Sequence, residues 1–106
     1  MKESLFLKII NREIDSDIIY ETEFVIVIKD INPQAPIHFL VIPKKKFKTI
    51  SDIPPADFFY LSKLFETIQH LSKTIPQADQ YKIIINNGEK AGQCVFHLHI
   101  HFLAGF

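Results

Sequence analysis

The sequence has one cysteine, three glycines, no tryptophan and no excess of either charge among its 106 residues. Cys94 has no partner with which to form an internal disulfide, so a disulfide-stapled fold is excluded. Lys plus Arg and Asp plus Glu each number 12, which leaves no overall field to attract the phosphates of a long nucleic acid. We therefore expect no nucleic-acid partner.

Long apolar runs are also absent. No run approaches the roughly 18 residues that a membrane-spanning helix needs. No charged-then-apolar segment with a cleavage site opens the chain. We expect no membrane partner, a cytoplasmic location and, at this length, one domain over residues 1–106.

Hydrophobic residues are plentiful for so short a chain. They make up 47% of it, and phenylalanine occurs 10 times. Their burial can drive folding and still leave apolar surface for a second copy, so we expect a homodimer. The segments expected to meet in it are the main helix, Pro55 to Ile75, and the strand Tyr81 to Ile85.

Two helices and five strands are predicted from residue patterns. Near-helical spacing of apolar residues predicts a short helix over Leu5 to Ile10 and a long one over Ser51 to Ile75, capped by Ser51 or Asp52. The predicted strands are Ile18–Glu21, Phe24–Asp30, His38–Ile42, Tyr81–Ile85 and Val95–Leu103. Consecutive strands favour antiparallel pairing, so the predicted class is α+β: a five-stranded, mostly antiparallel sheet with one long and one short helix.

Three histidines alternate near the C-terminus: His97, His99 and His101. Successive side chains of a strand point to opposite faces, so these imidazoles share one face while the apolar residues between them enter the core. We expect them about 6.6 Å apart on an exposed or cleft-lining surface, each titrating near neutral pH.

Such a row has three interpretations. It can be polar filling on a solvent-facing strand, although strict alternation of three makes that a weak explanation. It can be a metal site, but a straight row suits one tetrahedral ion poorly, and His38, His70 and Cys94 complete no recognisable zinc spacing. The third interpretation is covalent catalysis, in which one imidazole attacks and its neighbours orient it and manage charge and protons.

Phosphorus chemistry suits a histidine nucleophile. Neutral imidazole attacks without being deprotonated, and it leaves well from a phosphoramidate. The loop Gly88 to Gly92, just before the row, offers backbone N–H groups to phosphate oxygens with little steric bulk. The lysine run from Lys44 to Lys48 is a weaker phosphate candidate, since such runs are usually solvated loops.

The segment Gln93 to Leu103 resembles the defining motif of the histidine-triad (HIT) family. The segments Asp30 to Pro36 and His38 to Lys45 resemble the Hint branch of that family, the purine nucleoside phosphoramidases. The nucleotidyltransferase branch has glutamine at the last triad position, where this chain has His101. The dinucleoside polyphosphate hydrolase branch is a weaker match around the triad.

The resemblance implies a role for each polar residue of the motifs. His99 would be the nucleophile that takes the nucleotidyl group. His97 and His38 would orient it and relay protons, and His101 would bond the α-phosphate or the bridging atom. Asp30 would accept hydrogen bonds from the ribose hydroxyls.

The resemblance also implies further contacts with the nucleotide. Asn86 and Cys94 would touch the phosphate or the leaving group, although this branch usually has serine at the position of Cys94. The implied walls of the nucleobase pocket are Leu5, Phe6, Ile9, Ile28 and Ile31. Without the resemblance, these apolar residues would be assigned to the core.

The leading hypothesis is hydrolysis of the P–N bond in purine nucleoside phosphoramidates, and of acyl- or aminoacyl-adenylates, with no metal or other cofactor. Two alternatives stay open. One is a dinucleoside polyphosphate hydrolase of the same family, and the other is a nucleotide-binding or metal-binding interaction module.

Overall fold

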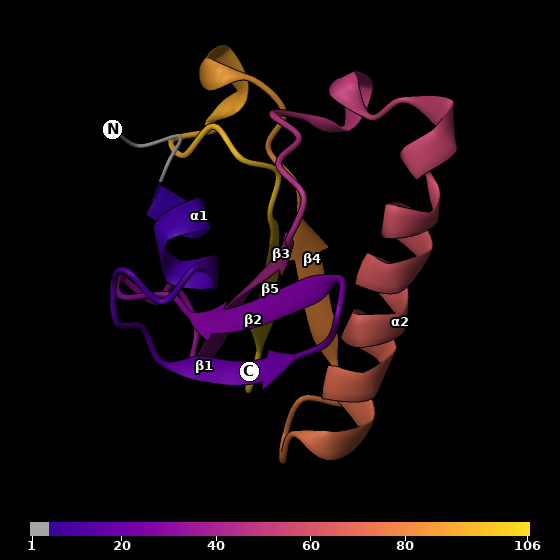
Figure 1. Ribbon diagram of the computed structural model, residues 1–106. Coiled ribbons are helices and arrows are strands. Elements are labelled where there is room, and N and C mark those ends of the chain that lie inside the picture. Colours follow the sequence, from indigo (N-terminus) through magenta and orange to yellow (C-terminus); the bar gives the residue numbers. More distant parts are fainter. Residues whose placement is uncertain (1–4) are drawn as a thin grey trace.

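The structure, a computed structural model, describes residues 5–106. Its five strands form one sheet in the order β1-β2-β3-β5-β4, and every neighbouring pair is antiparallel. The elements are α1 (Leu5–Ile10), β1 (Ile18–Glu21), β2 (Val25–Lys29), β3 (Ile37–Pro43), α2 (Phe59–Thr74), β4 (Tyr81–Ile84) and β5 (Ile100–Ala104). The predicted α+β class is confirmed (Figure 1).

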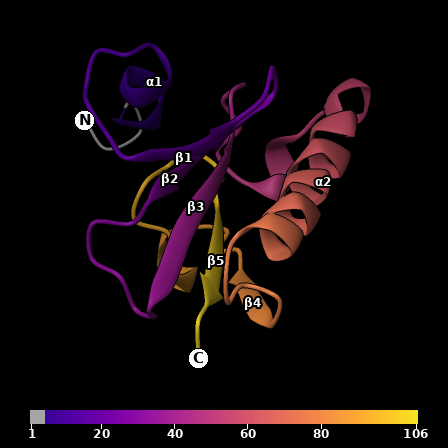
Figure 2. The same ribbon diagram turned by 90° about the horizontal axis from the view of Figure 1, so that it is seen from below.

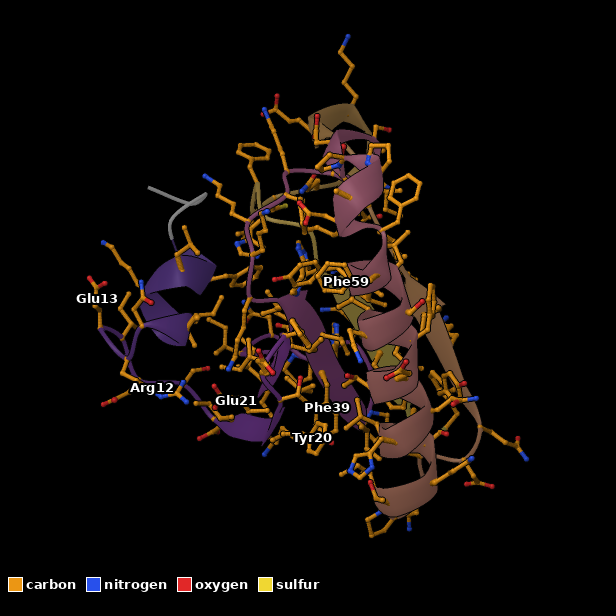
Figure 3. The ribbon with its side chains drawn as sticks, turned by 45° about the vertical axis from the view of Figure 1, so that its right-hand side comes forward. Arg12, Glu13, Tyr20, Glu21, Phe39 and Phe59 are labelled. Carbon is orange, nitrogen blue, oxygen red and sulfur yellow. The ribbon has the colours of Figure 1, made fainter. Side chains whose placement is uncertain are left out.

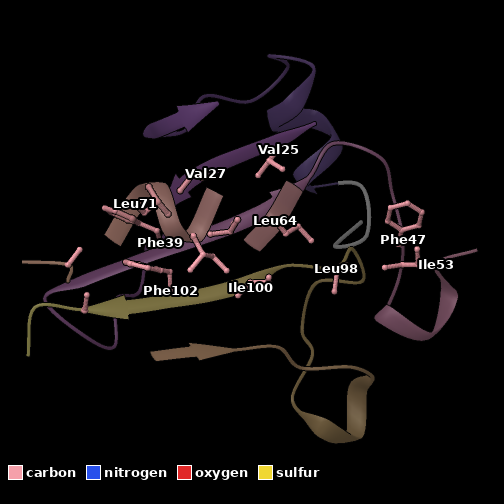
Figure 4. Close-up of a cluster of buried hydrophobic side chains, with 14 residues drawn as sticks. Val25, Val27, Phe39, Phe47, Ile53, Leu64, Leu71, Leu98, Ile100 and Phe102 are labelled. Atoms are coloured by element: carbon pink, nitrogen blue, oxygen red, sulfur yellow. The ribbon is translucent and has the colours of Figure 1, made fainter. Parts of the chain in front are cut away.

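The two helices cover opposite faces of the sheet (Figure 2). Toward α2, alternate strand residues such as Val27, Val41 and Phe102 pack with Leu64 and Leu71 in a large apolar cluster (Figure 4). Toward α1, the intervening strand residues form a smaller apolar cluster with the helix. That cluster consists of Phe6, Ile9, Ile26, Ile28, Leu40 and Ile42. The period of two in the strands therefore builds two separate cores on one sheet.

Ion pairs fasten the end of α1 to the sheet. Arg12 follows the helix and pairs with Glu21 of β1, and the two side chains point toward one another (Figure 3). Lys44, just after β3, reaches the other oxygen of the Glu21 carboxylate at 2.6 Å. The hydrogen bond from Lys44 is the largest cause that lowers the pKa of Glu21, and Arg12 adds to it. The chain that leaves α1 is thus tied to two strands.

The long helix begins later than its apolar spacing predicts. The α2 helix starts at Phe59 rather than Ser51, because the two consecutive prolines break the preceding chain into 3₁₀ turns at Ile50–Asp52 and Pro55–Asp57. Asp52 is not a cap of α2: its carboxylate accepts the backbone N–H of Thr49 at 3.1 Å. Within residues 5–106, no helix has the length and apolarity needed to cross a membrane.

The fifth strand is also shorter than predicted at its start. It begins at Ile100 rather than Val95, because the preceding backbone bonds to the chain after β3 instead of to a neighbouring strand. Leu98 N, for example, donates to Phe47 O at 2.6 Å. The predicted alternation nevertheless holds, since Leu98 and Ile100 are both buried in the core under α2.

Candidate active site

A cleft of about 540 Å³ opens on the α1 side of the sheet. It is lined by every residue to which the family resemblance assigned a role, apart from His97, whereas the lysine run from Lys44 to Lys48 does not line it. Those lining residues are Leu5, Phe6, Ile9, Ile28, Asp30, Ile31, His38, Asn86, Cys94, His99 and His101. Its volume lies in the range of small-molecule sites. Segments far apart in the chain thus meet around one hollow.

His99 has one defined tautomer. Its Nδ1 lies 2.7 Å from the backbone oxygen of His97, and a carbonyl oxygen only accepts, so Nδ1 carries the proton. The lone pair of the neutral ring is then on Nε2. Burial lowers the pKa of His99, against the opposing effects of its bond to His97 O and of the Asp30 carboxylate. His99 is therefore a neutral imidazole at neutral pH, with its proton on Nδ1 and a free lone pair on Nε2.

His97 lies behind the cleft rather than on it. The ring is fully buried, donates from Nε2 to Pro43 O at 2.8 Å, and stands edge-on to Phe6 with ring centroids 5.7 Å apart. Burial lowers its pKa to about 4. The prediction that all three histidines lie on an exposed or cleft-lining surface is wrong for this one. Its link to His99 runs through its backbone oxygen.

Phe6 of α1 packs against the nucleophile candidate. Its ring lies edge-on to His99, with centroids 5.1 Å apart, and it is 2% exposed. Edge-to-face contacts of this kind hold a ring in one orientation. Phe6 therefore supports the histidines from behind as much as it lines the cleft.

His38 and His101 form a hydrogen-bonded pair across β3 and β5. The backbone N–H of Gln34 donates to His38 Nδ1 at 2.9 Å, so the proton of His38 is on Nε2. That Nε2 lies 2.9 Å from His101 Nδ1 and 3.4 Å from a carboxylate oxygen of Asp30. The Nε2–H of His38 therefore donates to His101, and the Asp30 carboxylate lies beside the pair.

The tautomer of His101 follows from its partner. Because His101 Nδ1 accepts from His38, the proton of the neutral His101 ring is on Nε2. The pKa of His101 is lowered to about 4, mainly by burial and then by the nearby imidazoles of His99 and His38, against the opposing effect of the Asp30 carboxylate. The site therefore places a lone pair on His99 beside an N–H donor on His101, with the two ring centroids 5.0 Å apart.

The same residues form the one cluster within residues 5–106 whose ligand atoms are close enough to hold a metal ion. The oxygen of Asp30 and the ring nitrogens of His38 and His101 lie within 4.8 Å of one another. A histidine binds a metal through a lone pair, but His38 Nε2 carries the proton as long as Gln34 N–H donates to Nδ1. The pair is better arranged to pass or donate a proton than to bind an ion.

A glycine-containing loop forms another wall of the cleft. Gly92 has a φ of 99°, in the left-handed region that favours glycine, and a side chain there would meet Asn86 at 3.7 Å. Cys94 follows, exposed, with its Sγ 3.6 Å from Gly92 O. The loop thus brings the Asn86 amide and the Cys94 thiol to the same cleft. The N–H groups of Gly88 and Gly92, which the sequence offered to phosphate, instead donate within the loop, to Gln93 Oε1 and Glu89 O.

Some residues that line the cleft were given no role by the sequence analysis. Ile14, Asp15 and Ser16 belong to the irregular connection between α1 and β1, and their approach to the cleft is decided by folding alone. Leu40 was within reach of sequence reasoning, because it follows His38 by two residues on β3 and so shares its face. The remaining lining residues that had no assigned role are Lys29, Asn32, Gln34 and Val95.

The fold and site define a histidine-lined α+β domain of the histidine-triad class, and the comparisons agree. The sequence model of the HIT domain family matches residues 11–106. A HIT-like protein of Synechocystis is 42% identical over 104 residues, covering 98% of this chain and 91% of its own length. The chain belongs to the HIT family, as its motifs predict.

Two further relatives describe the family more closely. A protein of Escherichia coli named purine nucleoside phosphoramidase is 37% identical over 105 residues, 98% of this chain and 88% of its own length. A solved HIT family hydrolase from Clostridium thermocellum superimposes with a TM-score of 0.92 at 43% identity, covering 96% of this chain and 90% of its own.

Proposed function

We propose that this protein hydrolyses the P–N bond of purine nucleoside phosphoramidates, and the related bond of acyl- or aminoacyl-adenylates, through a nucleotidyl intermediate on His99. The observation that carries the proposal is the fixed tautomer of His99. Its Nδ1–H is held by His97 O at 2.7 Å, which leaves Nε2 as a nucleophile at the cleft. The name of the Escherichia coli relative supports the choice of substrate.

The proposed reaction has two steps. In the first, His99 Nε2 forms a bond to the α-phosphorus while the P–N bond breaks, and the nitrogen keeps the electron pair and takes up a proton as the amine departs. In the second, water adds to phosphorus, the P–N bond to His99 breaks, and the proton lost by water balances the one taken by the amine. The products are the amine and a nucleoside monophosphate.

Charge that develops on the phosphate needs donors. His101 Nε2–H supplies one, and its position is set by the bond from His38 to His101 Nδ1 at 2.9 Å. The Asn86 amide lines the same cleft and can supply another. Neutral rings are an advantage here, since protonation of His99 would remove the attacking lone pair.

The part of the cleft beside His38 suits a nucleoside. Asp30 lines it with one carboxylate oxygen, Oδ1, occupied by Asn32 N at 2.8 Å, and the other, Oδ2, 3.4 Å from His38 Nε2. We propose that this carboxylate accepts the ribose hydroxyls. The flat nucleobase would lie between the apolar residues of α1 and the exposed Ile31 at the rim.

The test compares leaving groups. Purified protein is expected to release AMP from adenosine 5′-phosphoramidate at least about tenfold faster than from diadenosine polyphosphate, and to keep its activity in EDTA. The opposite preference would favour the polyphosphate hydrolase. Loss of activity in EDTA that zinc restores would favour a metal site, and no turnover of either substrate would favour a binding module.

We also propose a homodimer that pairs the β4 edge with a second copy. Within the described sheet β4 pairs only with β5, so its other edge is open for pairing. Large apolar side chains are exposed on α2 and β4, among them Phe65 at 45%, Tyr81 at 39% and Ile84 at 42%. An open edge beside exposed apolar residues is typical of a surface that another copy covers.

Light scattering at micromolar concentration tests the dimer. The wild type is expected to have twice the chain mass, and Ile84→Lys is expected to shift it toward the monomer by placing a charge at the edge. Glu89→Lys, on an exposed turn away from β4, is the control and should remain dimeric. A monomeric wild type contradicts the proposal.

A further inference from the structure

The chain that carries His97 and His99 lies outside the strand ladder, since β5 begins only at Ile100. Within the described residues, it is held by bonds to the last residue of β3 and to the connection that follows it. The ring of His97 donates to Pro43 O at 2.8 Å, and Leu98 N donates to Phe47 O at 2.6 Å. The start of this segment is therefore held in place by contacts other than strand pairing.

Gln93 lies at the start of this segment and is only 2% exposed. Its buried side chain makes three hydrogen bonds. Its Oε1 accepts Gly88 N at 2.8 Å, and its Nε2 donates to Lys48 O at 2.7 Å and to Val95 O at 3.0 Å. Gln93 N also donates to Gly88 O at 3.0 Å. One amide thus joins three separate stretches of backbone.

Only a carboxamide of this length satisfies all three partners. Two of them are carbonyl oxygens and need donors, while Gly88 N–H needs an acceptor. Glutamate has no donor when ionised, and methionine of similar size has neither group. Either substitution would leave buried backbone groups of Gly88, Lys48 or Val95 without a hydrogen bond, and this cost favours other positions of the loop.

The joined stretches enclose the loop that faces the cleft. Gly88 stands before the loop and Val95 after it, while Gly92 and Cys94 between them line the cleft. Gln93 itself is not one of the lining residues. Lys48 O supplies the third anchor, in the connection that also holds Leu98.

We propose that Gln93 is a positioning residue: it holds the phosphate-facing loop at a fixed place relative to His99. The inference rests on the proposed function, because the loop matters for rate only if a phosphoryl group reacts beside it. If the Asn86 amide and the Cys94 thiol move by a fraction of an ångström, their contacts with the transition state weaken far more than the ground-state binding of base and ribose does.

The experiment uses three variants and one control. Gln93→Met removes all three bonds, Gln93→Glu keeps only the acceptor, and Gln93→Asn keeps the amide but shortens its reach. Gln80→Glu makes the same charge change at an exposed glutamine. Each protein is assayed for kcat on adenosine 5′-phosphoramidate, for Kd of AMP by calorimetry and for thermal unfolding.

We expect kcat to fall about 10- to 100-fold in the Met and Glu variants, while Kd for AMP changes less than about threefold. Gln93→Asn should fall in between, and it serves as the test if the other two do not fold. The control should match the wild type. Unchanged kcat in a folded variant, or equal losses in kcat and AMP affinity, would overturn the positioning role.

Hydrogen exchange separates this inference from the proposed function. The Gly88 amide is expected to be protected in the wild type and to exchange at least about tenfold faster in Gln93→Met. If the wild type neither turns over the phosphoramidate nor binds AMP, the proposed function is wrong, whereas unchanged Gly88 exchange shows that Gln93 does not hold the loop.

Discussion

The two faces of the sheet use the same strands in opposite ways. The face toward α2 is a closed apolar cluster in which side chains such as Val41, Leu64 and Phe102 are completely buried. The face toward α1 has a smaller apolar cluster and, beside it, a cleft lined by His38, His99 and other polar groups. Alternate residues of β3 and β5 contribute to each face.

The difference shows how one small sheet can be both stable and reactive. The α2 face stabilises the fold by burial, which is nondirectional and tolerates any well-packed apolar set. The α1 face orients rings by directional bonds, such as Gln34 N to His38 Nδ1, that select one tautomer each. Substitutions on the two faces should therefore separate activity from stability.

The largest expected effect is on the α1 face. His99→Ala should lower kcat by at least about 10³, because it removes the attacking nitrogen, while Kd for AMP changes little. His101→Ala should cost about 10² to 10³, as expected for one lost transition-state donor. Steady-state kinetics with calorimetry checks both, and turnover by His99→Ala close to that of the wild type would contradict the mechanism.

On the α2 face, stability is expected to fall instead. Phe102 is completely buried and stacks on Phe39 and Tyr81, with ring centroids 6.2 and 4.9 Å away. Phe102→Ala should lower the free energy of unfolding by about 3–5 kcal/mol. Phe106→Ala, at a residue that is 76% exposed, is the matched control and should stay within about 0.5 kcal/mol. Equal losses in urea melts would contradict the comparison.

A third prediction concerns acid. Burial lowers the pKa of His97 to about 4 from the ordinary 6.5. Between these two pH values the unfolded chain therefore binds a proton at His97 and the folded chain does not. Stability from this residue is complete above pH 6.5 and is lost as pH falls toward 4, by on the order of 3 kcal/mol.

His97→Gln tests that pH dependence. Urea melts between pH 7 and pH 4 should show a shallower loss of stability in this variant than in the wild type. His70→Gln makes the same substitution at an exposed residue of α2 and is the control. Parallel slopes for wild type and His97→Gln would show that His97 is protonated without unfolding.

The smallest effect is expected at Cys94. Its exposed thiol lines the cleft but donates hydrogen bonds more weakly than a hydroxyl, so Cys94→Ser should keep activity within about threefold or raise it. Mass spectrometry of the trapped intermediate should place the nucleotide on His99. An adduct on sulfur, or an inactive serine variant, would make Cys94 the nucleophile.

The sequence could predict the fold class and, through the family motifs, most of the residues around the cleft. Alternation in the strands and the spacing in α2 follow from local geometry, which explains why five antiparallel strands and a long helix were within reach. Element boundaries were not, because the start of β5 depends on partners such as Phe47, which lies 51 residues earlier than Leu98.

The sequence by itself determined which side chains share a face, since that depends only on the period of the backbone. Tertiary structure alone decided what each histidine can do. His97 is buried and donates to Pro43, His99 keeps a free Nε2, and His101 is an N–H donor. These differences arise because a ring's tautomer and pKa depend on partners and burial, which the fold brings from distant parts of the chain.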